Sequence, residues 1–268
     1  MSPPSQDIWG SISMNRITIA FENKKAFIAF ITGGDPDMET TENLIIAMAE
    51  SGVDIIEIGI PFSDPVAEGP IIQEADERAL ANGFTVDKLF DMIKRVRQKV
   101  EIPLLFMTYI NPIFVYGKER FMQRCAQCGI DGIIVPDLPF EERDELESVC
   151  AEHGVTQISM ISPTSQDRIA TIAKNAEGFL YCVSSLGVTG VRSEITTNLA
   201  EMIGQVKKAS SVPCAIGFGI STPEQARNMA AISDGVIIGS AIVRIIAEYR
   251  TASIEPVKNF VKEVKDAI

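Results

Sequence analysis

The sequence is poor in the residue types on which several classes of enzyme depend. It contains one histidine, His153, and its five cysteines are an odd number without the spacing of a disulfide framework. A Ser-His triad and a histidine-rich metal site are therefore unsupported, and free cysteines are typical of a reducing cytoplasm. No predicted strand contains a lysine, which argues against an aldolase that forms a Schiff base.

Long apolar runs and an excess of positive charge are also missing. The apolar runs are far too short to span a bilayer, and no basic segment followed by an apolar stretch opens the chain, so we expect neither membrane insertion nor export. The net charge of −12 argues against broad nucleic-acid binding, which requires a basic face. An anionic substrate would have to be held by local dipoles, because the overall field repels it. We expect a cytoplasmic protein.

The chain does contain a regular alternation of short apolar strands and amphipathic helices. The predicted strands are Ala26–Ile31, Asp54–Gly59, Pro103–Thr108, Gly132–Val135, Thr156–Ile161, Gly178–Val183, Pro213–Phe218 and Asp234–Gly239. Helices are predicted at Thr40–Ser51, Val86–Val100, Lys118–Cys128, Glu141–His153 and Leu199–Ala209. Nearly continuous apolar strands suit a parallel sheet that helices cover. The alternation predicts an α/β fold, a single-domain (β/α)8 TIM barrel, with an open doubly wound sheet as the alternative.

The predicted barrel occupies residues 14–268, and residues 1–13, rich in proline and serine, are expected to form a flexible extension. Two connections are longer than the rest. One follows Gly59 and is predicted to be helical from about Ile71, and the other, between Val183 and Ile195, is rich in glycine and serine. Long loops at the catalytic end of a barrel usually close over a substrate or bind it.

Glu57 is the outstanding polar residue of the predicted strands. Strand alternation puts Ile55, Glu57 and Gly59 on one face and Ile56 and Ile58 on the other. If the two isoleucines of the second group face the helices, Glu57 points into the barrel near its C-terminal mouth. Burial there should raise its pKa toward neutrality, as a general acid–base group requires. The alternative is a structural carboxylate hydrogen-bonded inside the barrel.

A second acid lies in the connection that follows. Glu68 and Asp64 both occur in the segment FSDPVAEGP, which two prolines and a glycine stiffen. The stiffened loop could present Glu68 over the barrel mouth, and Asp64 is the competing acid. The alternative is that one of the two caps a turn or helix and the other is solvated. Spacing alone does not choose between them.

Three glycine-bearing segments follow later strands and indicate a phosphate site. They are Gly187–Gly190, Gly217–Ser221 and Gly239–Ser240. Backbone N–H groups and a helix N-terminus can bind a phosphate dianion without a lysine, and barrels commonly build such a site after their seventh and eighth strands.

Other candidate residues are better explained by structure than by chemistry. Cys125 and Cys128 fall on one predicted helix, where packing is the favoured interpretation, and His153 is expected at a helix C-terminus. Tyr109, Asn111 and Tyr181 end predicted strands and could line a pocket or pack in the core.

The segment IEIGIPFSDPVAEGP, residues 56–70, closely resembles the signature of the tryptophan synthase alpha subunit family. The resemblance runs from about Met14 to Tyr249. It includes FITGGDP at 30–36, YINPIF at 109–114, VPDLPFEE at 135–142, SSLGVTG at 184–190, GFGIS at 217–221 and GSAIV at 239–243. It implies a lyase of tryptophan biosynthesis that cleaves indole-3-glycerol phosphate to indole and glyceraldehyde 3-phosphate by a retro-aldol reaction.

The resemblance also implies roles for individual residues. Glu57 would be the principal acid–base, and Glu68 stands where the family has an aspartate that hydrogen-bonds the indole N–H. Because glutamate is one methylene longer, we expect this loop to be locally adapted. The phosphate would be bound by backbone around Gly190, Gly219, Gly239 and Ser240, and the substrate pocket would include Phe30, Tyr109, Ile134, Tyr181, Thr189 and Phe218.

The family usually pairs with a beta subunit that carries pyridoxal phosphate and receives indole, in an alpha2-beta2 heterotetramer. No cofactor or metal is expected in this chain, and the loop at residues 61–65 and the region near Asn111 would face the partner. Two alternatives stay open. One is a stand-alone lyase that releases indole, and the other is a weakly active phosphate-binding barrel that serves as an activating subunit.

Overall fold

The structure is a computed structural model that describes residues 15–183, 192–217 and 219–268. The expected N-terminal extension, residues 1–13, lies outside the described residues, as do Thr189, Gly190 and Phe218.

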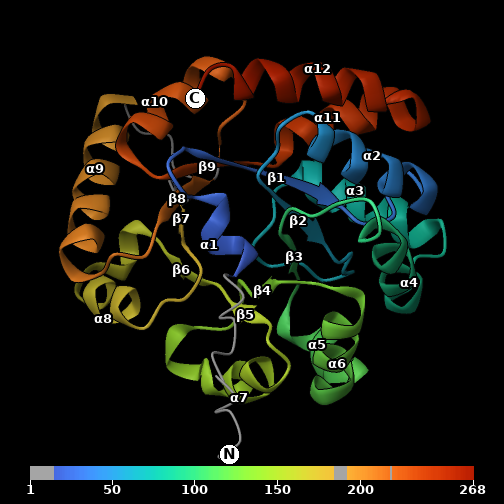
Figure 1. The fold of residues 1–268 in the computed structure, drawn as a ribbon, viewed down its shortest axis with the longest axis horizontal. Coiled ribbons are helices and arrows are strands. Elements are labelled where there is room, and N and C mark those ends of the chain that lie inside the picture. Colours follow the sequence, from blue (N-terminus) through green and yellow to red (C-terminus); the bar gives the residue numbers. More distant parts are fainter. Residues whose placement is uncertain (1–14, 184–191, 218) are drawn as a thin grey trace, which may run out of the picture.

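The described residues form a barrel of parallel strands surrounded by helices (Figure 1). The strands are β1 (Ala26–Thr32), β2 (Ile55–Gly59), β3 (Leu104–Met107), β4 (Gly132–Ile134), β5 (Thr156–Gln157), β6 (Ser159–Ile161), β7 (Leu180–Val183), β8 (Cys214–Gly217) and β9 (Gly235–Ile238). Their order is β5-β4-β3-β2-β1-β9-β8-β7-β6, and every pairing is parallel. The (β/α)8 prediction is confirmed.

One predicted strand, Thr156–Ile161, is divided in two. Its first half, β5, pairs with β4 and its second half, β6, pairs with β7. Between them Ile158 N donates to Ile133 O at 2.9 Å. The same segment therefore pairs first with one neighbouring strand and then with the other, which closes the ring and leaves no open sheet edge.

The helices are α1 (Arg16–Ala20), α2 (Met38–Glu50), α3 (Pro70–Ala81), α4 (Val86–Val96), α5 (Ile110–Tyr116), α6 (Lys118–Cys128), α7 (Asp144–Glu152), α8 (Ile169–Lys174), α9 (Arg192–Ala209), α10 (Pro223–Ile232), α11 (Ser240–Tyr249) and α12 (Ile254–Lys265). Short 3-10 segments, η1 (Phe140–Glu142), η2 (Pro163–Arg168) and η3 (Arg250–Ala252), precede or follow them. No helix among the described residues is long and apolar enough to cross a membrane.

Three predicted helices needed correction. The helix predicted over Val86–Val100 ends at Val96, and the other two differ at their first turn. The helix predicted over Glu141–His153 begins as the 3-10 turn η1 and becomes α-helical only at Asp144. The helix predicted from Leu199 begins at Arg192, so the glycine- and serine-rich connection is shorter than predicted. In both cases the first turn is polar, and apolar periodicity alone does not identify it.

Strand alternation sorts the apolar side chains into an inner and an outer layer. Ile28, Ile55 and Leu105 belong to a cluster inside the barrel, whereas Ile56 and Ile58 pack with the residues of the surrounding helices. The predicted facing of strand β2 is therefore confirmed. Helix α1 lies across the N-terminal end of the ring (Figure 1) and adds its own apolar side chains to the inner cluster.

Three aspartates tie neighbouring strands together at the N-terminal end of the barrel. Asp54, Asp131 and Asp234 each precede a strand and accept a hydrogen bond from a backbone N–H of the adjacent strand, at 2.7, 2.9 and 3.0 Å. Each also pairs with at least one lysine or arginine. This end of the barrel is therefore fixed by charged groups, and the opposite end is free to carry the chemistry.

Candidate active site

Glu57 points into the barrel from β2 and is completely buried. No donor among the described residues hydrogen-bonds to either of its carboxyl oxygens. Burial raises its pKa from an ordinary value of 4.5 to about 8, with no other cause contributing. The carboxyl is therefore protonated at neutral pH in the free protein, and it is a proton donor without a protein acceptor.

Phe30 lies beside Glu57 in the β1–β2 register, and two glycines make room for its ring. A Cβ built on Gly59 would meet the Phe30 ring at 2.7 Å, and one built on Gly239 would meet it at 3.2 Å. The ring packs against Ile72 of α3 and Val243 of α11. An apolar wall thus lies directly beside the buried acid at the C-terminal end of the strands.

Tyr181 of β7 and Ile134 of β4 are buried and belong to the inner cluster of the barrel. The Tyr181 ring covers Gly217, where a Cβ would lie 2.7 Å from the phenol oxygen. The pKa of Tyr181 is raised well above its ordinary value, first by burial and then by the charge of Glu57. Glu57 is therefore near enough to act on the Tyr181 hydroxyl electrostatically, and the tyrosine stays neutral.

Glu68 is held over this end of the barrel by its loop. Tyr109, at the N-cap of α5, accepts a hydrogen bond from Ala67 N at 2.9 Å, and Gln73 Nε2 donates to the Glu68 carbonyl at 2.8 Å. The Glu68 side chain is half-buried and burial raises its pKa. The competing acid, Asp64, is exposed and accepts a hydrogen bond from the neighbouring Ser63 hydroxyl.

Asp76 of α3 is a site residue that the sequence analysis missed. It is buried, it lies in hydrogen-bonding contact with the Glu68 carboxyl, and its Oδ2 accepts from Phe62 N at 3.3 Å. Burial and the charge of Glu68 raise its pKa to about 8. Helical spacing was the available signal, because Asp76 shares the buried face of α3 with Ile72 and Ala79.

The predicted phosphate residues are described in part. Gly239 is the N-cap of α11 and Ser240 its exposed first residue, with no side chain capping the helix. By contrast, the neighbouring helix α10 is capped by Thr222, whose hydroxyl accepts from Gln225 N. Gly219 is exposed with φ +80°, and a Cβ there would meet no atom within 4 Å. Uncapped N–H groups at the mouth can bind an anion.

The remaining candidates have structural explanations. Cys125 and Cys128 are buried in the outer core layer, so the packing interpretation is confirmed. His153 ends α7 as predicted, and its ring lies 2.7 Å from Glu119 Oε1. Asn111 is exposed in the first turn of α5.

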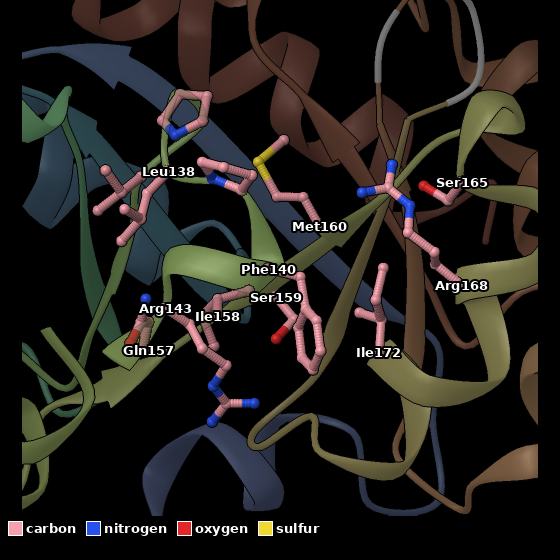
Figure 2. A pocket seen from close by; sticks show the side chains of 13 residues that line it. Leu138, Phe140, Arg143, Gln157, Ile158, Ser159, Met160, Ser165, Arg168 and Ile172 are labelled. Atoms are coloured by element: carbon pink, nitrogen blue, oxygen red, sulfur yellow. The ribbon is translucent and has the colours of Figure 1, made fainter. Parts of the chain in front are cut away.

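A cavity of about 150 Å³ lies away from these residues, where β5 gives way to β6 (Figure 2). Its wall includes Arg143, stacked over the Phe140 ring at 5.3 Å, and Arg168. Both arginines are already paired with glutamates, Arg143 with Glu147 and Arg168 with Glu141. The cavity therefore offers no uncompensated charge to a ligand, and it contains neither Glu57 nor Glu68.

Comparison with known proteins agrees with this geometry. Residues 18–268 match the sequence profile of a family described as tryptophan synthase alpha chain. The chain is 46% identical to the tryptophan synthase alpha chain of Lacticaseibacillus casei over 95% of its length and 96% of the relative's. It is also similar to the crystal structure of tryptophan synthase subunit alpha from Legionella pneumophila, with a TM-score of 0.87, 39% identity and coverage of 96% and 99% of the two chains.

The raised pKa of Glu57 predicts a pH-dependent cost to stability. Between pH 4.5 and about 8 the folded chain keeps a proton that the unfolded chain has lost, so stability falls as pH rises through this window. We expect Glu57→Gln to increase the free energy of unfolding relative to the wild type progressively from pH 5 to pH 8. The whole shift, from 4.5 to about 8, sets an upper limit on the order of 5 kcal/mol.

Denaturant unfolding at several pH values measures this difference. Glu263→Gln, which removes an exposed glutamate on α12, serves as the control and should show no such trend. A stability difference between Glu57→Gln and the wild type that does not change with pH would contradict the assignment of a neutral, buried carboxyl.

Proposed function

The chain belongs to the tryptophan synthase alpha chain family, and we propose that Glu57 is the acid–base group of its reaction. Its function is that of the family: it is a lyase of tryptophan biosynthesis that cleaves indole-3-glycerol phosphate to indole and glyceraldehyde 3-phosphate. The observation that carries the assignment of Glu57 is its complete burial without a hydrogen-bond partner at the mouth of the barrel.

The neutral form of Glu57 is the form that the first step needs. Its carboxyl donates a proton to C3 of the indole ring, which turns the ring into a leaving group. The bond between C3 and the glycerol carbon then breaks, and its electron pair restores the aromatic ring. The hydroxyl of that carbon becomes the aldehyde of glyceraldehyde 3-phosphate, and its proton returns to the Glu57 carboxylate. No proton is gained or lost overall.

Glu68 is proposed to accept a hydrogen bond from the indole N–H while positive charge develops on the ring nitrogen. Support comes from its anchored loop and from its half-buried carboxyl above the strand ends. Phe30, Tyr181 and Ile134 are proposed to line the indole pocket. Tyr109 contributes chiefly by bonding to the Glu68 loop. Phe218 and Thr189, also proposed for the pocket, lie outside the described residues.

The phosphate group is proposed to bind the uncapped N-terminus of α11 at Gly239 and Ser240, together with Gly219 and Gly190. The positive end of a helix dipole and free N–H groups attract a dianion locally, which matters in a chain of net charge −12. The contrast with the side-chain cap of α10 supports this choice of helix.

The family assignment implies a beta subunit as partner, and the family needs no cofactor in this chain. We propose an alpha2-beta2 complex in the cytoplasm in which the beta chain carries pyridoxal phosphate and receives indole. The proposed docking face is the C-terminal end of the barrel, where Val66 and Val115 are each 80% exposed and Phe114 is 45% exposed. Exposed apolar side chains of this size are typical of interaction sites.

The first experiment is an assay of indole release from indole-3-glycerol phosphate, with and without a beta chain. We expect Glu57→Gln to lower kcat at least ~10²-fold, because general acid–base catalysis contributes that much or more, while substrate still binds. We also expect wild-type turnover to rise with the beta chain. Turnover of Glu57→Gln within a few-fold of wild type would refute the assignment, and high turnover by the isolated wild-type chain would favour the stand-alone lyase.

A second experiment tests the phosphate site. Ser240→Asp places a negative charge at the N-terminus of α11, and we expect it to raise KM at least about tenfold, equivalent to about 1.4 kcal/mol, with little change in kcat. Thr251→Asp adds the same charge beyond the other end of α11 and should leave KM unchanged. Equal KM values for the two variants would place the phosphate elsewhere.

A third experiment tests the docking face. Val115→Asp puts a charge into the exposed apolar surface, and we expect the Kd for a beta chain to rise at least about tenfold, because a buried unpaired charge is costly. Ile19→Asp, at an exposed apolar position on α1 across the opposite end of the barrel, is the matched control. If Ile19→Asp weakens the complex and Val115→Asp does not, the partner binds the other end.

A further inference from the structure

Glu68 and Asp76 form a pair of carboxyl groups that the acid–base step does not use. Asp76 comes from the buried face of α3, with 3% of its surface exposed, and Glu68 comes from the loop directly before that helix. Their carboxyl groups are in hydrogen-bonding contact. The backbone N–H of Phe62 donates to Asp76 Oδ2 at 3.3 Å, so Asp76 also holds the start of the loop.

The contact between the two carboxyl groups requires a proton. Two carboxylates are both acceptors, so they can hydrogen-bond to each other only when one of them is protonated. Within the described residues, no donor with good geometry reaches Glu68 Oε2, although this atom is buried. A proton shared with Asp76 would satisfy it.

Among the residues whose side chains the structure describes, no lysine or arginine forms an ion pair with Glu68 or Asp76 that could take the place of that proton. The nearest arginine on the same helix, Arg78, donates two hydrogen bonds of 2.8 Å to Asp35, and the charge of Asp35 acts on Asp76 in the unfavourable direction. From the α5 side the Tyr109 hydroxyl faces Glu68 and can donate a hydrogen bond to it, and burial raises the pKa of this hydroxyl to about 12, so it supplies no positive charge. From α11 and β1, the apolar side chains of Val243 and Phe30 pack against α3.

The electrostatic surroundings of the two carboxyl groups agree with the geometry. Burial raises the pKa of both carboxyl groups, and the pKa of Asp76 reaches about 8 with the charge of Glu68 as its second cause. Since the two groups interact, these values belong to the pair as a unit. Closely spaced carboxyl pairs generally hold one proton and one negative charge at neutral pH, because two like charges in contact repel each other.

We propose that Asp76 is a positioning residue for Glu68: the two carboxyl groups share one proton, which holds the longer glutamate side chain against α3 and presents a single negative charge to the indole N–H. This inference rests on the proposed function of Glu68. It also explains how the loop accommodates a glutamate at position 68, because the extra methylene is taken up by a contact between the Glu68 side chain and helix α3.

Loss of the shared proton has a predictable consequence. As pH rises through about 8, the pair becomes two like charges in contact, and their repulsion moves the Glu68 carboxyl away from α3. In Asp76→Asn, the side-chain amide donates a hydrogen bond to Glu68 whenever Glu68 is ionised. Raising the pH then no longer creates two like charges, so the alkaline displacement of the Glu68 carboxyl is absent. The Asn side chain is nearly the same size and keeps an oxygen for Phe62 N.

The test uses the Glu57→Gln chain, which we expect to bind substrate but to turn it over at least ~10²-fold more slowly, and which lacks the other neutral carboxyl of the site. Infrared spectroscopy of the ligand-free protein at pH 7 should show the carbonyl band of a buried carboxylic acid. We expect this band to vanish in Glu57→Gln/Asp76→Asn and to persist in Glu57→Gln/Glu77→Gln, where the second change removes an exposed glutamate adjacent to Asp76. If Asp76→Asn does not fold, Asp76→Ser replaces it.

Substrate affinity supplies the second readout. We expect the Kd for indole-3-glycerol phosphate in Glu57→Gln to rise about tenfold between pH 7 and pH 9.5, and to stay nearly constant with Asp76→Asn added. A carboxylic acid band that persists in Glu57→Gln/Asp76→Asn would overturn the inference, and so would the same pH dependence of the Kd with and without Asp76→Asn. Neither result would affect the proposed role of Glu68. Unchanged affinity in Glu57→Gln/Glu68→Ala would instead remove Glu68 from the substrate site, and the inference and that part of the proposed function would fall together.

Discussion

The Glu57 carboxyl is buried on β2 without a hydrogen-bond partner among the described residues, and the barrel must offset the cost of burying it. The closed ring of parallel strands makes this possible, because β2 is fixed on both sides by pairing with β1 and β3. The aspartates at the opposite end add hydrogen bonds between strands where no chemistry occurs. Stability and reactivity are thereby separated along the barrel axis.

Different regions around Glu57 suit different parts of the proposed substrate. An apolar wall around Phe30 suits an aromatic ring, and the bare N-terminus of α11 suits a phosphate dianion. The pair formed by Glu68 and Asp76 offers one negative charge rather than two, which limits repulsion of an anionic substrate in an already acidic protein. In the proposed mode of binding, the bond to be broken lies between these regions, and Glu57 supplies the proton.

Much of this arrangement could be predicted from the sequence, for identifiable physical reasons. Period-2 alternation in the segment from Asp54 to Gly59 was sufficient to orient Glu57, because a parallel strand buries both of its faces. The division of β5 from β6 could not be predicted, since a change of pairing partner within one apolar run leaves no mark in its periodicity. Asp76 was missed because a carboxylate in an amphipathic helix is ordinarily solvated, and its burial depends on Glu68 and on the Phe62 backbone.

The most direct measurement is a ¹³C NMR titration of the Glu57 carboxyl carbon in protein labelled at glutamate, with the signal assigned by its absence in Glu57→Gln. This account predicts that the Glu57 signal titrates near pH 8, because a buried carboxyl without a hydrogen-bond partner keeps its proton until then. A signal that titrates near the ordinary value of 4.5 would show an ionised carboxylate at neutral pH. In that case Glu57 could not donate the first proton, and the proposed mechanism would be wrong.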